Sequence, residues 1–71
     1  MNILNVFANN VKKYRLSLGL SQEKLAEICK LHRTYISDIE RSQRSISLKN
    51  VQKIANALNV PIYKLFLEVE K

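Results

Sequence analysis

The sequence predicts an all-α fold of five short helices, and three observations support that prediction. Apolar residues return at steps of three and four, which places them on one face of a helix rather than on one side of a strand. Residues suited to helix ends, such as Ser21, Ser47 and Asn59, fall between these apolar segments. The 71 residues include one glycine and one proline and no flexible linker, so residues 1–71 are expected to form a single domain.

The first two helices are predicted at residues 4–18 and 21–29. The apolar stripe of the first consists of Leu4, Phe7, Val11, Tyr14 and Leu18. Gly19 follows it and can adopt the left-handed conformation that ends a helix. Ser21 is a suitable N-cap for the second helix, and Glu23 favours the positive end of the helix dipole. The buried side of this helix is expected to be Leu25, Ala26, Ile28 and Cys29.

The other three helices are predicted at residues 32–40, 47–58 and 61–69. Ile36 and Ile39 are the apolar anchors of the third helix. Ser47 can cap the fourth helix and Asn59 can end it. The core face of the fourth helix is expected to be Leu48, Val51, Ile54, Ala55 and Leu58. Pro61 suits the start of the fifth helix, whose apolar side is Ile62, Leu65, Phe66 and Val69.

Composition and charge narrow the class of function. Twelve Lys and Arg against six Asp and Glu give a net charge of +6, which favours an anionic partner, most simply a nucleic acid. The alternative is a soluble basic protein without such a partner. Cys29 is the single cysteine, so an intramolecular disulfide is excluded. Cys29 and His32 are too few ligands for zinc, and we predict no metal and no other cofactor.

Catalysis and membrane insertion are not expected. No partnered nucleophile or acid–base pair is visible in the sequence, so we predict that the protein is not an enzyme. No basic segment precedes a long apolar run at the start of the chain, which argues against a signal peptide. No apolar run approaches the roughly 20 residues that span a bilayer. We therefore expect a cytoplasmic protein.

Residues 21–40 read as two short helices joined by a tight turn, an arrangement that presents side chains to the DNA major groove. The candidate base-reading residues on the second of these helices are Arg33, Thr34, Tyr35, Ser37 and Asp38. Arg33 can donate two hydrogen bonds to guanine O6 and N7, and Thr34 suits a phosphate or a thymine methyl group. Asp38 would either accept from cytosine N4 or orient a neighbouring arginine. The alternative is that all five residues form an ordinary solvated face.

The segments LGLSQEKLAE, HRTYISDIER and VQKIANALNV resemble the lambda-repressor-like helix-turn-helix family, and the resemblance covers about residues 5–67. RTYISDIER is most similar to the controller proteins of bacterial restriction–modification systems. The resemblance implies a five-helix, lambda-repressor-like DNA-binding domain. Its second helix would lie across the groove and its third helix would enter it.

The resemblance also assigns residues to the DNA backbone and to the scaffold. Gln22 and Arg44 match family positions that contact DNA. The residues expected to follow the DNA backbone beside the groove are Arg41, Gln43, Lys49 and Asn50, and His32 is expected to cap the third helix and to reach a phosphate. Arg15 and Glu40 match a family pair that pins the third helix to the first; the alternative is that Arg15 clamps a phosphate. Lys30 and Ser42 replace glycines that are frequent in relatives, so the turn at Lys30 is expected to be strained.

A homodimer is expected because one reading helix covers only a few base pairs, whereas two helices about 34 Å apart read one face of the duplex. The dimerisation region is predicted at residues 58–70, with the interface residues Val60, Ile62, Tyr63, Phe66, Leu67 and Val69. The alternative is that this segment closes the core of the monomer. The resemblance further implies that two dimers bind adjacent sites.

These observations predict a homodimeric transcriptional regulator that binds a palindromic double-stranded DNA operator. The resemblance implies that it controls expression of a restriction endonuclease and of itself, with RNA polymerase as a further partner. A phage-type repressor and the antitoxin of a toxin–antitoxin pair are alternatives of the same class. A non-specific nucleic-acid or protein-interaction module is the alternative from another class.

Overall fold

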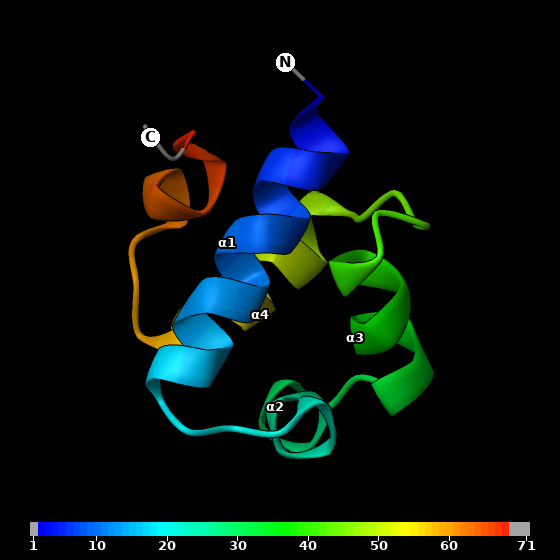
Figure 1. The fold of residues 1–71 in the computed structure, drawn as a ribbon. Coiled ribbons are helices and arrows are strands. Elements are labelled where there is room, and N and C mark those ends of the chain that lie inside the picture. Colours follow the sequence, from blue (N-terminus) through cyan, green and yellow to red (C-terminus); the bar gives the residue numbers. More distant parts are fainter. Residues whose placement is uncertain (1, 69–71) are drawn as a thin grey trace.

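The structure, a computed structural model, describes residues 2–68, and the regular elements in that range are all helices, with no strand (Figure 1). Its elements in chain order are α1 (Ile3–Ser17), α2 (Gln22–Cys29), α3 (Arg33–Glu40), α4 (Leu48–Leu58) and the 3-10 helix η1 (Ile62–Phe66). The predicted all-α class is therefore confirmed. The predicted fifth α-helix is wrong, because the chain forms only the five-residue η1 there. Val69 lies outside the described residues.

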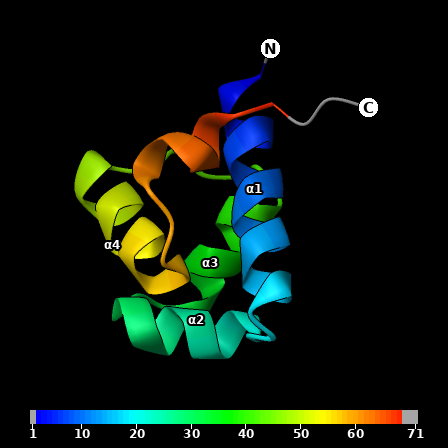
Figure 2. The same ribbon diagram turned by 90° about the vertical axis from the view of Figure 1, so that its left-hand side faces the viewer.

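The four α-helices surround one core, and η1 covers its upper end. Figure 2 shows α1 and α4 on opposite sides of the molecule, with α2 crossing beneath them and α3 behind. η1 packs on both α1 and α4, whereas α3 packs on α1 and α2. None of the helices within residues 2–68 is long and apolar enough to cross a bilayer.

The helix ends predicted at Ser21, Ser47 and Asn59 are confirmed. Ser21 Oγ accepts a hydrogen bond from the Lys24 amide at 2.9 Å, and Ser47 Oγ accepts from the Asn50 amide at 3.2 Å. Asn59 ends α4 in the left-handed conformation, with φ of 58°. These side-chain caps pair amides that would otherwise lack a partner in the first turn of each helix.

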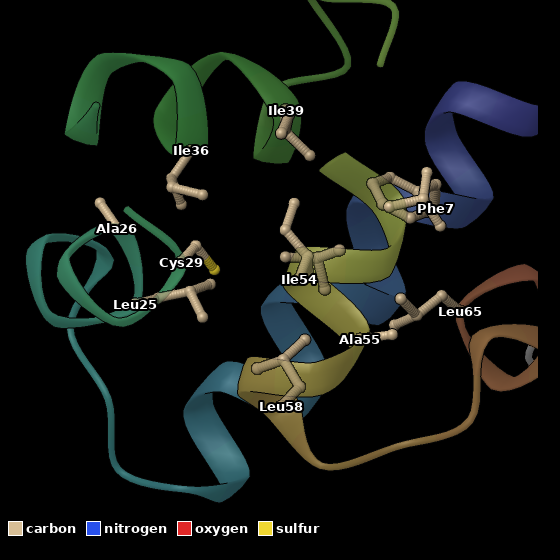
Figure 3. Packing of buried hydrophobic residues seen from close by; sticks show 12 residues of the cluster. Phe7, Leu25, Ala26, Cys29, Ile36, Ile39, Ile54, Ala55, Leu58 and Leu65 are labelled. Atoms are coloured by element: carbon tan, nitrogen blue, oxygen red, sulfur yellow. The ribbon is translucent and has the colours of Figure 1, made fainter. Parts of the chain in front are cut away.

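Each helix contributes the apolar side chains of one face to the core. Figure 3 shows Ile36 and Ile39 of α3 directed toward Leu25 of α2 and Ile54 of α4. The completely or almost completely buried apolar side chains also include Phe7, Val11, Leu58 and Leu65. Cys29 belongs to this core, and burial raises the pKa of its thiol to about 11.

Three apolar residues that were predicted to be buried are exposed instead. Leu18 is 50% exposed because α1 ends at Ser17 and Leu18 turns away as its C-cap. Ile28 is 46% exposed because it lies on the outer side of α2, whereas the next residue, Cys29, faces the core. Leu48 is 86% exposed because it is the first residue of α4, one turn before the first buried position.

Asn10 is a buried polar residue that the apolar pattern did not reveal. Its side-chain amide donates to the carbonyl oxygens of Leu65 at 3.0 Å and Leu67 at 2.8 Å. These bonds attach η1 to α1. They also satisfy two carbonyl groups at the end of η1 and just after it.

Candidate nucleic-acid interface

The turn between α2 and α3 fixes the direction of α3. Lys30 adopts the left-handed conformation with φ of 60°, and the Leu31 amide then donates to the Ala26 carbonyl at 2.9 Å. Lys30 thus stands at a positive φ, where a glycine is frequent in relatives. Ile36 and Ile39 are at most 2% exposed and hold α3 against the core, so the opposite side of α3 faces outward.

The first turn of α3 presents polar side chains without internal partners. Arg33 and Thr34 are exposed, and neither makes a side-chain hydrogen bond or ion pair to the rest of residues 2–68. His32 is the N-cap residue, but its side chain makes no capping hydrogen bond. This end of α3 is therefore available to an external ligand.

The middle of α3 is tied to the start of α4. The Asn50 side-chain amide donates to the Tyr35 hydroxyl at 3.0 Å, and Tyr35 is half-buried. The guanidinium carbon of Arg44 lies 4.8 Å from the centroid of the Tyr35 ring, in a cation–π arrangement. Tyr35 was predicted as a base reader, and it also links α3, the α3–α4 loop and α4.

Asp38 joins two arginines. Arg41 Nη2 lies 2.6 Å from Asp38 Oδ1, and Arg44 Nη2 lies 3.3 Å from Asp38 Oδ2. The hydrogen bond from Arg41, followed by the bond from Arg44, lowers the pKa of Asp38. Two roles were predicted for Asp38, and the one present in the structure is the contact with neighbouring arginines.

Glu40 ends α3 inside the fold. Its carboxylate accepts from Arg15 Nε at 2.7 Å and Arg15 Nη2 at 3.0 Å, a two-pronged ion pair in which the Glu40 side chain is only 3% exposed. Arg15 also donates to the Leu20 carbonyl at 2.7 Å. The hydrogen bond to Glu40 raises the pKa of Arg15. The structure thus places Arg15 and Glu40 together and fastens α3 to α1.

Gln22, which was predicted to contact a phosphate, is also attached to Glu40. Its side-chain amide donates to Glu40 Oε1 at 3.1 Å. Gln22 is half-buried and is the first residue of α2. Its phosphate contact stays a prediction. The other predicted backbone residues, Gln43 and Lys49, are exposed on the α3–α4 loop and at the start of α4.

Ser37 is half-buried on α3, and no side-chain hydrogen bond from it is found among residues 2–68. Four cationic side chains are exposed around this face: Arg33, Arg41, Arg44 and Lys49. The arrangement suits a polyanion whose grooves admit a helix, because the cations lie on the exposed side of α3 and on the segment that follows it.

A second exposed surface lies at η1. Ile62, Tyr63 and Leu67 are 37%, 62% and 53% exposed, whereas Val60 and Phe66 are half-buried. Leu65 is completely buried, and Phe66 stacks on Phe7 with ring centroids 5.2 Å apart. The segment therefore does both things that the sequence left open: Leu65 and Phe66 close the core, and other apolar side chains remain exposed.

The requirements of a metal site and of a reactive thiol can also be compared with the described residues. No group of three His, Cys, Asp or Glu side chains that could hold a metal ion occurs in that range. An open hollow of about 350 Å³ between α2 and α4 is lined by Ile28, Cys29, Lys30, Lys53, Asn56 and Ala57. The Cys29 thiol there is buried and its raised pKa makes it a poor nucleophile.

Comparison with known proteins gives consistent results. Residues 11–65 match a family model described as helix-turn-helix. The control protein C.BamHI of Bacillus amyloliquefaciens is 57% identical over 60 residues, which cover 83% of this chain and 74% of that protein.

Two solved structures share the fold at substantial identity. The restriction-modification controller protein C.AhdI from Aeromonas hydrophila has a TM-score of 0.86 and 41% identity, and the match covers 89% of this chain and 96% of that one. The controller C.Esp1396I, solved as a tetramer in complex with its natural 35 base-pair operator, has a TM-score of 0.84 and 38% identity. That match covers 93% of this chain and 87% of the other.

Proposed function

Because the chain belongs to the helix-turn-helix family, we propose that it is a sequence-specific, double-stranded DNA-binding transcriptional regulator, the controller of a restriction–modification system. The predicted resemblance to this group is confirmed by the identity to controller proteins. Its activity is binding, with no reaction step.

The observation that carries the proposal is the first turn of α3, where Arg33 and Thr34 are exposed on a helix that the core holds rigidly. A guanidinium group at this position can donate two parallel hydrogen bonds to the O6 and N7 atoms of a guanine. Thr34 supplies a methyl group and a hydroxyl for a neighbouring base or phosphate. Ser37 and Tyr35, both half-buried, would flank this surface, and Tyr35 also packs against the core.

Contacts to the phosphates would surround this reading surface. Arg41, Gln43 and Arg44 extend from the loop after α3, and Lys49 and Asn50 from the first turn of α4. Gln22 and His32 stand at the N-termini of α2 and α3, where free helix amides also favour phosphate oxygens. These contacts supply affinity and salt dependence, whereas the bases supply specificity.

Two copies are needed to place two reading helices on one face of DNA, about 34 Å apart. We place the dimer interface on η1 and its flanks: Val60, Ile62, Tyr63, Phe66 and Leu67, with Val69 beyond the described residues. A partner subunit would cover apolar side chains that the monomer leaves exposed. The tetramer of C.Esp1396I on its operator supports the binding of two dimers to adjacent palindromic sites.

In the cell, bound dimers would act in the cytoplasm on the promoters of the endonuclease gene and of the regulator's own gene. An activating complex of this kind places the protein beside RNA polymerase, so a polymerase contact belongs to the proposal.

The test is selection followed by titration. The wild-type protein would select duplexes from a randomised library, and the enriched duplex and a random duplex of equal length would be titrated over a range of salt concentrations. We expect the enriched duplex to bind at least about 10³-fold more tightly at physiological salt. Equal affinities would instead identify a non-specific nucleic-acid-binding module.

A further inference from the structure

The carboxylate of Asp38 lies within the surface that would meet DNA. Each of its two oxygens serves a different arginine, Arg41 at 2.6 Å and Arg44 at 3.3 Å. The Asp38 side chain is only 19% exposed, whereas the side chains of Arg41 and Arg44 are 64% and 47% exposed. The carboxylate is thus partly covered by two cations that remain accessible to a ligand.

Arg44 is held from a second side. Its guanidinium group stacks on the ring of Tyr35, and the Tyr35 hydroxyl accepts a hydrogen bond from Asn50. Arg44 itself lies in the segment between α3 and α4, which has no helix and passes through Ser42 at φ of 60°. A long side chain on such a segment would otherwise sample many rotamers. Asp38 and Tyr35 together therefore restrict Arg44 before any ligand arrives.

Asp38 also has an electrostatic cost. A negative charge among Arg33, Arg41, Arg44 and Lys49 repels phosphates and lowers the affinity of this face for any duplex. Such a charge is useful when it favours one complex over the others, because specificity is a difference between affinities.

We propose that Asp38 is a positioning residue that sets DNA specificity, an inference that rests on the proposed function. Its carboxylate holds Arg41 and Arg44 where they fit the phosphate path of the operator, so that they read the shape of the DNA. Its charge lowers the affinity for every duplex, and the placed arginines offset that loss on the operator alone.

The substitution Asp38→Asn tests this, because it keeps the shape of the side chain and removes its charge. The matched control is Glu27→Gln, which also removes one negative charge from an ion pair three residues apart, with Lys24 Nζ at 3.1 Å on the exposed surface of α2. The probes are the duplex enriched by the wild-type protein and a random duplex of equal length. Circular dichroism would verify that both variants are folded.

For Asp38→Asn we expect several-fold tighter binding to the random duplex and unchanged or weaker binding to the enriched duplex. The ratio of the two affinities should fall about tenfold or more. For Glu27→Gln both affinities should shift by the same small factor, which leaves the ratio unchanged. Equal ratios in the wild type and Asp38→Asn would overturn the proposal.

A double-mutant cycle with Arg44→Gln separates positioning from direct base reading. If Asp38 acts through Arg44, the effects of Asp38→Asn and Arg44→Gln on the enriched duplex should be far from additive. Additive effects would mean that Asp38 does not act through Arg44 and would refute the positioning of that arginine. A selection that enriches no sequence contradicts the proposed function itself, whereas an enriched duplex with an unchanged ratio contradicts this inference alone.

Discussion

The two ends of α3 differ in what holds their side chains. At the first turn, Arg33 and Thr34 are exposed and make no side-chain bond to the rest of residues 2–68. At the last turn, the side chain of Glu40 is almost completely buried and accepts hydrogen bonds from Arg15 and Gln22. One eight-residue helix thus has an end built into the fold and an end left for a ligand. Substitutions at the last turn should affect stability, and those at the first turn should affect binding.

The largest expected effect is that of Glu40→Ala. It leaves the Arg15 guanidinium buried without its carboxylate, which should lower the free energy of unfolding by about 3–5 kcal/mol. Urea denaturation measures this loss. The control is Glu27→Ala, which removes an exposed carboxylate. This variant should lose less than about 1 kcal/mol of the free energy of unfolding. Equal losses in the two variants would remove the distinction between the ends of α3.

The next largest effect concerns the exposed surface at η1. The side chain of Leu67 is exposed there, as those of Arg33 and Thr34 are at the first turn of α3. Leu67→Asp should raise the dimer dissociation constant at least about tenfold, because a charge would be buried in the interface. Sedimentation equilibrium measures this constant. Leu16→Asp is the control, because Leu16 on α1 is similarly exposed at 56% but lies outside the proposed interface. If Leu16→Asp dissociates the dimer and Leu67→Asp does not, the interface lies elsewhere.

The smallest effect concerns the turn that precedes the first turn of α3. Lys30→Gly should stabilise the protein by about 0.5–1 kcal/mol, because glycine adopts the left-handed conformation without a Cβ clash. Lys53→Gly, in the exposed interior of α4, should have the opposite sign, with a loss of about 1 kcal/mol. Thermal unfolding would compare the two. Destabilisation in both variants would show that the turn at Lys30 is not strained.

Local chemistry explains why much of the fold was predictable. Ser21, Ser47 and Asn59 act through bonds and backbone conformations within a few residues of themselves, so their roles follow from the sequence alone. The anchors Ile36 and Ile39 repeat at helical spacing for the same reason.

Long-range contacts explain what was not predictable. From the sequence, Asn10 resembles an exposed polar residue of α1. In the structure it is buried, and its side-chain amide donates to two backbone carbonyl groups that lie 55 and 57 residues further along the chain. Leu48 and Ile28 have the right spacing for the core, yet both are exposed in the folded chain. The bond from Asn50 to Tyr35 likewise joins two elements whose relative position no periodic pattern specifies.

The central claim is that the first turn of α3 reads bases, and Arg33→Ala tests it most directly. Binding of the wild type and the variant would be measured on the enriched duplex, on its single-base-pair variants and on a random duplex. The account predicts a loss of about 1–3 kcal/mol on the enriched duplex, a smaller loss on the random duplex, and a relaxed preference at one base pair. Equal losses on every duplex would make Arg33 a phosphate contact and contradict the claim.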